Sequence, residues 1–235
     1  MNPYNPYAPG IGRAQPVVDT NAFLRKVYAF MAAGLFATGV TATAVASSDT
    51  LFGLIRGNPI VFYGLIFAEL GMVLAFSAAA RRLSTAAAAA LFFAYAIVNG
   101  ATLSIIFLNY TASSIGSTFF VTAGTFGAIS AFGYATKRDL SGVGNFAFMG
   151  LIGLIIASVV NIFLHSPMIY WLTTFVGVIV FTCLTAYDTQ RLKAYAASST
   201  GAGDETKIAM QGALILYLDF INLFLYLLRL FGRRR

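Results

Sequence analysis

Seven apolar stretches of roughly 20 residues, separated by short polar breaks, dominate this sequence. A helix needs about 20 consecutive apolar residues to cross the hydrocarbon core of a bilayer. Composition agrees, because 59% of the residues are hydrophobic and only 10% are charged, whereas soluble domains carry roughly a quarter of charged residues. We therefore predict an all-α integral membrane protein with seven spans, at 25–46, 59–80, 85–108, 115–136, 144–164, 168–190 and 208–231.

The sequence outside the spans indicates one domain preceded by a tail. The first 24 residues are rich in Pro, Gly and Asn, a composition typical of disorder. We see no repeat of 20–50 residues, and glycines recur within the spans, as in the segment FGAISAFG. Small residues let helices approach closely in lipid. We expect a disordered cytoplasmic tail over 1–24 and a single compact bundle over 25–235.

The positive charge of the chain is gathered at the ends of the predicted spans. The formal net charge is +7, and seven of the fifteen basic residues lie in three groups, 81–82, 137–138 and 233–235. This placement favours anchoring at an anionic membrane surface over nucleic-acid binding. The single Cys183 excludes an internal disulfide and a thiolate metal cluster. We expect the lipid bilayer as a partner, no nucleic acid and no cofactor.

Charged loops predict the orientation. The loops on the side of the N-terminus carry most Lys and Arg, whereas the opposite loops carry only Arg56 as a permanent cation. Cytoplasmic loops are the basic ones, so we expect a multi-pass protein of the inner (plasma) membrane with a cytoplasmic N-terminus. Arg233–Arg235 contradict a seventh crossing by this rule. The last segment therefore either re-enters the membrane or crosses against the rule.

Three acidic residues, Glu69, Asp188 and Asp219, lie at membrane depth. Ionisable residues inside a membrane are rare and often functional. Asp188 and Asp219 are 31 positions apart, with their midpoint inside the polar segment 197–205. If the flanking helices form an antiparallel hairpin, both carboxyl groups reach a similar depth. Such a pair can share one proton and titrate as a unit, which makes it a proton-sensitive latch.

Other interpretations of these residues remain open. Each aspartate can simply hydrogen-bond a neighbouring helix, with Asn99, Asn161 and Asn222 as partners, and such contacts contribute only ~0.6–2 kcal/mol. Asp188 lies near a predicted helix end and can form a surface ion pair with Arg191 or Lys193. Arg81 or Arg82 can turn inward to Asp188 or extend toward the interface, as long basic side chains commonly do.

The segments AYDTQRLK at 186–193 and LYLDFINLFLYLLRLFG at 216–232 resemble the signature of the Bax-inhibitor-like family, in its bacterial branch. The similarity extends to AELGMVLAFSAAARRLSTA, to NGATLS at 99–104 and to KRDLSGVGNF at 137–146, and so covers most of the chain beyond residue 20. The resemblance implies a seven-span bundle whose last helix is central and is wrapped by the other six, which favours a true seventh crossing.

The resemblance also implies a pH-sensitive calcium leak controlled by a paired aspartate site. Carried over, this gives Asp188 and Asp219 as pH-sensing and gating residues and as transient calcium ligands, with Arg81 or Arg82 as the gating arginine. We add Glu69 as a candidate on the ion pathway, with calcium and protons as the partners and no catalytic residue.

Two alternatives belong to other functional classes. The protein can regulate a membrane protease, stress machinery or another membrane protein without relevant flux. Intramembrane aspartyl proteases also place two aspartates on adjacent spans, one of them after a tyrosine, as in Tyr187-Asp188. They need a glycine motif before the second aspartate, and Asp219 instead follows Leu216, Tyr217 and Leu218. We therefore expect no enzyme.

Overall fold

The computed structural model describes residues 19–79, 82–198 and 205–235 of the protein. This part of the chain is a bundle of helices, with one isolated β-bridge between Tyr110 and Arg234. In chain order the helices are α1 (Thr20–Ala46), α2 (Asp49–Gly57), α3 (Pro59–Ala79), α4 (Thr85–Leu103), α5 (Ile106–Asn109), α6 (Ala112–Ala135), α7 (Ser141–Leu164), α8 (Pro167–Ser198) and α9 (Glu205–Phe231). Seven of them are long and apolar enough to cross a membrane. The predicted fold class is confirmed.

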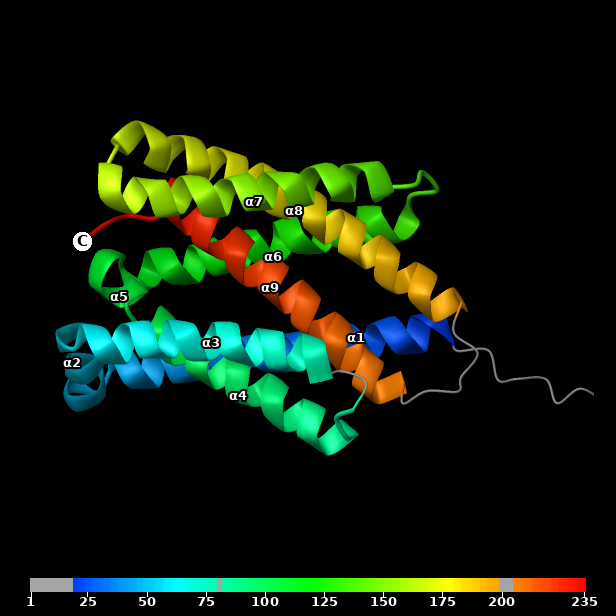
Figure 1. Ribbon diagram of the computed structural model, residues 1–235, viewed down its shortest axis with the longest axis horizontal. Helices are drawn as coiled ribbons and strands as arrows, with labels where there is room; N and C mark the ends of the chain where they lie inside the picture. The colour runs from blue at the N-terminus through cyan, green and yellow to red at the C-terminus, as the bar shows by residue number, and fades with distance from the viewer. Residues whose placement is uncertain (1–18, 80–81, 199–204) are drawn as a thin grey trace, which may run out of the picture.

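Two short helices lie at the end of the bundle where the chain finishes (Figure 1). The segment that forms α2 was predicted only as a break between spans. Its sequence DTLFGLIRG forms a helix because Ser48 caps its first turn. Phe52 and Ile55, three positions apart, form the less exposed face of this helix. In the third span, α4 ends at Leu103 and the short α5 follows, so the predicted span 85–108 is interrupted near Ser104.

The observed helix ends correct two predicted boundaries. Helix α1 begins at Thr20, where the Asp19 side chain accepts a hydrogen bond from the Asn21 backbone, so residues 20–24 do not belong to a disordered tail. The rest of the predicted tail, 1–18, lies outside the described residues. Helix α8 continues to Ser198, beyond the predicted end at 190. Its segment RLKAYAAS contains good helix formers, and a charged residue does not by itself end a helix.

Helix α9 runs obliquely through the middle of the bundle (Figure 1) and is the most buried of the spans. It packs against α1, α4, α6 and α8, whereas α3 packs mainly on α4 and α7 mainly on α8. The expectation of six wrapping helices is therefore wrong in one detail, because α3 and α7 form an outer layer. The helix is continuous from Glu205 to Phe231 and ends opposite the start of α1 (Figure 1). The last segment thus crosses the bundle and does not re-enter.

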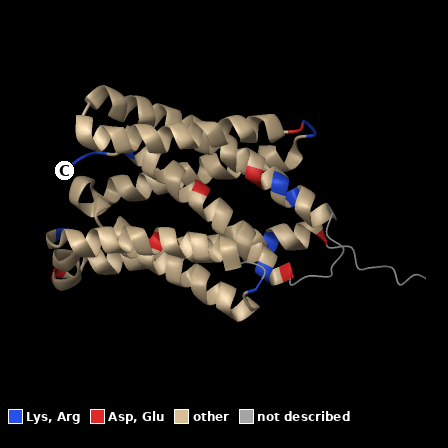
Figure 2. Ribbon diagram, viewed as in Figure 1, with Lys and Arg blue, Asp and Glu red and all other residues tan. Residues whose placement is uncertain are grey.

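Charged residues gather mainly toward the ends of the bundle, while single acidic residues lie within the helices between these ends (Figure 2). The outward faces carry many exposed apolar side chains, among them Phe36, Ile60, Phe120 and Phe163. Without a hydrophobic force between helices in lipid, close packing of small residues becomes important for association. We call the end where α1 begins the N-terminal end, and the end where α9 finishes the C-terminal end.

Gly133 on α6 marks a close approach between helices beside the predicted site. A Cβ atom at this position would collide with the backbone carbonyl of Ala186 on α8, two residues before Asp188. Backbone cannot yield as the tip of a side chain can. The glycine therefore sets how closely α6 and α8 pack.

We expect Gly133→Ala to lower the stability of the protein by about 1–3 kcal/mol, because the added methyl group forces α6 and α8 apart. The measurement is the thermal unfolding midpoint in detergent. Gly127→Ala is the matched control on the same helix, since nothing lies within 4 Å of its added Cβ. Equal midpoints for the two variants would show that the close approach does not constrain packing.

Candidate functional site

A cavity of about 790 Å³ lies between α3, α7, α8 and α9. It occupies the region where the outer helices α3 and α7 do not pack closely on α9. All three acidic residues predicted at membrane depth, Glu69, Asp188 and Asp219, line this cavity. The fold therefore brings Glu69 into the same cavity as two aspartates more than 100 positions away. The sequence had predicted proximity only for Asp188 and Asp219.

The carboxyl groups of Asp188 and Asp219 face each other within hydrogen-bonding reach. Both side chains are buried, at 9% and 5% exposure, so neither points to lipid. Oδ2 of Asp219 is buried, and no donor in the described part of the chain bonds it. Two ionised carboxylates are acceptors only. A proton held between them would supply the missing donor, and this is the arrangement that the hairpin argument predicts.

The depth of the pair depends on how the two helices tilt. Asp188 lies ten residues before the end of α8, and Asp219 lies fourteen residues after the start of α9. In two straight antiparallel helices whose connected ends are level, this difference of four residues would separate the side chains by roughly 6 Å along the axis. Helix α9 runs obliquely across the bundle (Figure 1). The inclination brings the two residues together, and the extension of α8 places Asp188 well inside the helix.

Neighbouring residues hold this part of α8 in position. Thr189 is fully buried and hydrogen-bonds Ser130 of α6 at 2.8 Å, and Tyr28 of α1 contacts both hydroxyl groups. Gln190 accepts from the Leu140 backbone and donates to the Arg138 carbonyl, at 2.9 and 2.8 Å. These bonds tie the helix turn that carries Asp188 to α1, α6 and the connection between α6 and α7.

Gly144 of α7 completes this arrangement. A Cβ atom here would come within 2.5–2.6 Å of the ring carbons of Tyr187. The glycine lets α7 pack directly against that ring. Because Tyr187 precedes Asp188, this contact sets the rotation of α8 that turns the carboxyl group toward α9.

Glu69 ends a chain of buried hydrogen bonds that crosses four helices. Its Oε2 accepts from Asn99 Nδ2 at 3.1 Å, and Asn99 Oδ1 accepts from the Tyr217 hydroxyl at 2.9 Å. The Tyr217 hydroxyl in turn lies 2.6 Å from Thr38 Oγ1. Glu69 Oε1 is buried without a partner in the described part of the chain. One carboxylate oxygen is thus held by the network, and the other is buried in a residue that lines the cavity.

Of the basic residues considered as partners of Asp188, Arg191 lies near it. Arg191 lines the cavity and lies close enough to Asp188 to act on it electrostatically. The two side chains do not form a salt bridge. The salt bridge found among the described residues joins Lys26 to Glu205 at the N-terminal end. Arg82 is exposed and does not line the cavity. Arg81 lies outside the described residues, and its predicted gating role stays a prediction.

The other residues considered as partners of the aspartates make contacts elsewhere or lie beside the pair. Asn99 serves Glu69 and not the aspartates, and Asn161 Oδ1 accepts from the Ser166 backbone at the turn after α7. Asn222 lines the acidic cavity beside Asp219, one turn along α9. Lys193 donates to the Tyr134 carbonyl at 2.7 Å rather than to Asp188. Within the described residues no three His, Cys, Asp or Glu side chains are close enough together to hold a metal ion.

Sequence reasoning missed Tyr217 and Tyr95 as parts of this region. Both are buried, their rings meet edge to face at 5.7 Å, and Tyr95 lines the cavity. Tyr217 was considered only as a residue preceding Asp219. The available signal was its position in a helix whose neighbours are nearly all apolar, because a buried tyrosine hydroxyl there needs a partner.

The sequence of this chain matches known proteins over nearly its whole length. The family model described as inhibitor of apoptosis-promoting Bax1 matches residues 20–235. The inner membrane protein YbhL of Escherichia coli (strain K12) is 48% identical over 223 residues, which cover 94% of this chain and 95% of that protein. An uncharacterised protein of Borreliella burgdorferi is 43% identical over 225 residues, covering 94% and 96% of the two chains. An uncharacterised membrane protein of Streptococcus pyogenes is 39% identical over 222 residues, covering 93% and 96%.

Proposed function

The chain belongs to the Bax-inhibitor-like family of membrane proteins, and from this premise we propose that it is a pH-sensitive calcium leak channel. A proton shared between Asp188 and Asp219 gates the leak. The observation that carries the proposal is the contact between these two buried carboxyl groups inside a cavity that also contains Glu69. The residues of the pair act as a sensor and perform no enzymatic reaction.

The shared proton acts as a latch between α8 and α9. With one proton between them, the two carboxyl groups hold the helices together without an unpaired buried charge. When the proton is lost as pH rises, two like charges face each other and α9 loosens from α8. A second proton, added at lower pH, removes the negative charge that attracts Arg191 and any passing cation. The leak therefore follows the protonation of the pair.

Oxygen ligands along the cavity suit calcium as the permeant ion. Calcium takes six to eight oxygen ligands in flexible geometry, whereas this cavity provides three carboxylates that do not converge on one point. Such a set binds a cation weakly, with water completing its shell. Asp188 and Asp219 then act as transient ligands and Glu69 as a second acidic station, which favours passage over retention.

The test is calcium flux into liposomes that contain only this protein, measured with an internal fluorescent indicator from pH 5 to pH 8. We expect flux above that of protein-free liposomes, with a sigmoidal dependence on pH. Absence of flux over the whole range would contradict the channel and favour the alternative class, a regulator of a membrane protease or of stress machinery. Sodium and magnesium gradients in the same liposomes would measure selectivity.

We further propose that the protein lies in the inner (plasma) membrane with its N-terminal end in the cytoplasm. The connection between α6 and α7 carries Lys137 and Arg138 at that end, as the basic-loop rule requires. The opposite end then carries Arg233–Arg235 against the rule. These residues follow the end of α9, and their backbone is hydrogen-bonded to the α5–α6 connection.

This orientation predicts the labelling of single cysteines in intact cells. In a Cys183→Ser background, Arg235→Cys should react with a membrane-impermeant maleimide added outside. Arg138→Cys is the matched control at the other end and should react only after permeabilisation. The reverse pattern would place the N-terminus outside, and labelling of both only after permeabilisation would contradict the crossing of α9.

A further inference from the structure

The chain beyond α9 is held firmly against the C-terminal end of the bundle. Thr111 donates to the Arg233 carbonyl at 3.3 Å, Arg235 donates to the Asn109 carbonyl at 3.0 Å, and Arg233 donates to Ser114 Oγ at 2.9 Å. The two bonds between backbone groups form the isolated bridge between Tyr110 and Arg234. The side chain of Arg234 therefore starts from a fixed backbone position.

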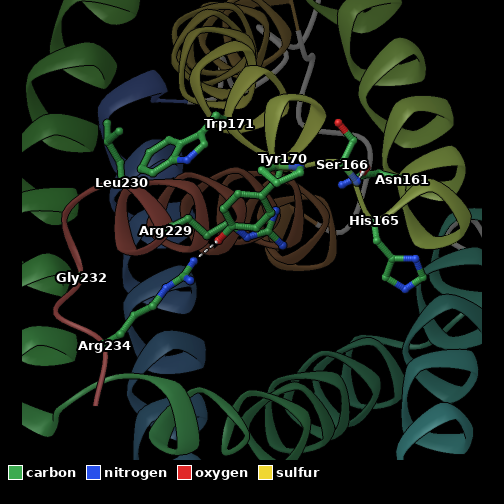
Figure 3. A pocket seen from close by; sticks show the side chains of 10 residues that line it. Asn161, His165, Ser166, Tyr170, Trp171, Arg229, Leu230, Gly232 and Arg234 are labelled. Carbon is green, nitrogen blue, oxygen red and sulfur yellow. Dashed lines mark hydrogen bonds between the residues drawn. The ribbon is translucent and has the colours of Figure 1, made fainter.

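Two arginines converge on the ring of Tyr170 (Figure 3). The guanidinium carbons of Arg229 and Arg234 lie 5.8 and 5.7 Å from the centre of this ring. Arg234 also donates to the Tyr170 hydroxyl at 3.1 Å, and Arg229 lies 5.2 Å from the ring of Tyr226. Both arginines thus lie at one aromatic ring and line the same two cavities. Paired guanidinium groups are well suited to binding an anion.

No acidic side chain in the described part of the chain balances these two charges. They line two adjoining cavities of about 670 and 380 Å³, and neither cavity is lined by Asp or Glu. Arg229 lies in the last turn of α9, where a cation interacts favourably with the helix dipole. That interaction explains one arginine. It does not explain why Arg234 is fixed beside it, since like charges repel.

The walls of the cavities supply further groups that suit an anion. Asn161 and Ser166 contribute to the larger cavity, and Asn109 and Tyr110 to the smaller. Burial raises the pKa of Tyr110 above its ordinary value, and the neighbouring Tyr170 adds to this effect while Arg234 opposes it. The Tyr110 hydroxyl therefore keeps its proton and can donate a hydrogen bond. Neutral donors beside paired guanidinium groups are typical of phosphate sites.

We propose that the C-terminal end of the bundle binds a phosphate group between Arg229 and Arg234. Guanidinium groups bind phosphate oxygens through two parallel hydrogen bonds, which gives arginine an advantage over lysine at such sites. Two sources can present the group, an anionic lipid headgroup or free phosphate. The site lies at the opposite end of the molecule from Lys26, Arg138 and Arg191, and it does not depend on the proposed leak.

The surroundings make a lipid headgroup one of these sources. Trp171 lines the larger cavity and is 46% exposed, and Phe163, Leu164 and Met168 lie exposed around the same turn between α7 and α8. Tryptophan and tyrosine are enriched at the headgroup level of membranes. A phospholipid held by its phosphate at the arginines would have apolar surface beside it for its chains.

The test is native mass spectrometry of the full chain, delipidated in detergent, with phosphatidylglycerol, phosphatidylcholine or inorganic phosphate added. We expect wild-type protein to bind phosphatidylglycerol or inorganic phosphate, and Arg229→Gln and Arg234→Gln to weaken that binding by about tenfold each. Arg235→Gln is the matched control, because it removes the same charge from the same end and lines neither cavity. It should bind as wild type does.

The arms of the experiment separate the outcomes. Selective retention of phosphatidylglycerol over phosphatidylcholine, without binding of inorganic phosphate, identifies the lipid headgroup. Binding of inorganic phosphate that competes with the lipid identifies the free ion. Wild-type binding by the double variant Arg229→Gln and Arg234→Gln, or equal loss in Arg235→Gln, overturns the proposal. Arg229 is exposed on the last turn of α9, so Arg229→Gln should fold and tests the site even if Arg234→Gln does not fold.

Discussion

Replacing either aspartate of the pair by asparagine should abolish the pH response of calcium flux. Wild-type flux should change by up to about tenfold per pH unit near the midpoint, as one shared proton allows. Asp188→Asn and Asp219→Asn keep the shape of the side chain but remove the shared proton. Each should reduce the change between pH 6 and pH 8 to about twofold or less. The readout is initial flux into liposomes at matched protein density.

The double variant tests whether the two residues act together. Independent residues have additive effects, whereas residues of one unit do not, so the double variant should resemble either single one. The apparent midpoint of the wild type belongs to the pair, and we expect it away from about 3.9, the value of an isolated aspartate.

Asp139→Asn is the control for loss of a carboxylate at the N-terminal end. Asp139 is exposed in the connection between α6 and α7, and hydrogen bonds from the Ser141 side chain and backbone hold its pKa below the ordinary value. It stays ionised throughout the tested range, so its loss should leave the pH response unchanged. Wild-type pH dependence in both Asp188→Asn and Asp219→Asn would reject the shared proton and leave the aspartates as helix–helix contacts.

The seven spans could be predicted because the bilayer imposes a length that apolar stretches must meet. The same reasoning failed for segments whose structure is not imposed by the thickness of the bilayer. Helix α2 was missed because nine amphipathic residues are too short to span, and its cap at Ser48 is a local signal. The end of α8 was placed too early because Arg191 and Lys193 suggested a loop. The helix continues past the apolar region, where charged residues are well tolerated in a helix.

Part of the candidate site was predictable for a similar reason. Asp188 and Asp219 lie on consecutive helices, so one hairpin turn relates their depths. Glu69 joins the same cavity from α3, and nothing in the sequence states how far α3 lies from α9. Arg191 was considered as a surface partner of Asp188, and it lies near that residue because helix α8 continues. The two arginines at the Tyr170 ring could not be predicted from the sequence. The position of Arg234 depends on the hydrogen bonds that the chain after Phe231 makes with Asn109 and Ser114.

Glu69→Gln should reduce calcium flux by about tenfold while leaving its pH midpoint unchanged. A divalent cation about 8 Å from a carboxylate is stabilised by roughly 4 kcal/mol at an effective dielectric constant of 20, and water in the cavity screens much of this. Glutamine keeps an oxygen that can accept from Asn99, so the chain to Tyr217 and Thr38 is preserved. The negative charge of the carboxylate is lost. Flux at the pH of maximal leak, measured over a range of calcium concentrations, gives the effect.

Glu205→Gln is the matched control, because this residue lies at the N-terminal end of α9, pairs with Lys26 and does not line the cavity. It should keep wild-type flux. The two kinds of variant then separate conduction from gating, since Glu69→Gln changes the amplitude and the aspartate variants change the pH dependence. If Glu69→Gln shifted the midpoint as the aspartate variants do, Glu69 would belong to the titrating group. If it left the amplitude unchanged, calcium would not pass along α3, and the path would have to run between α8 and α9 alone.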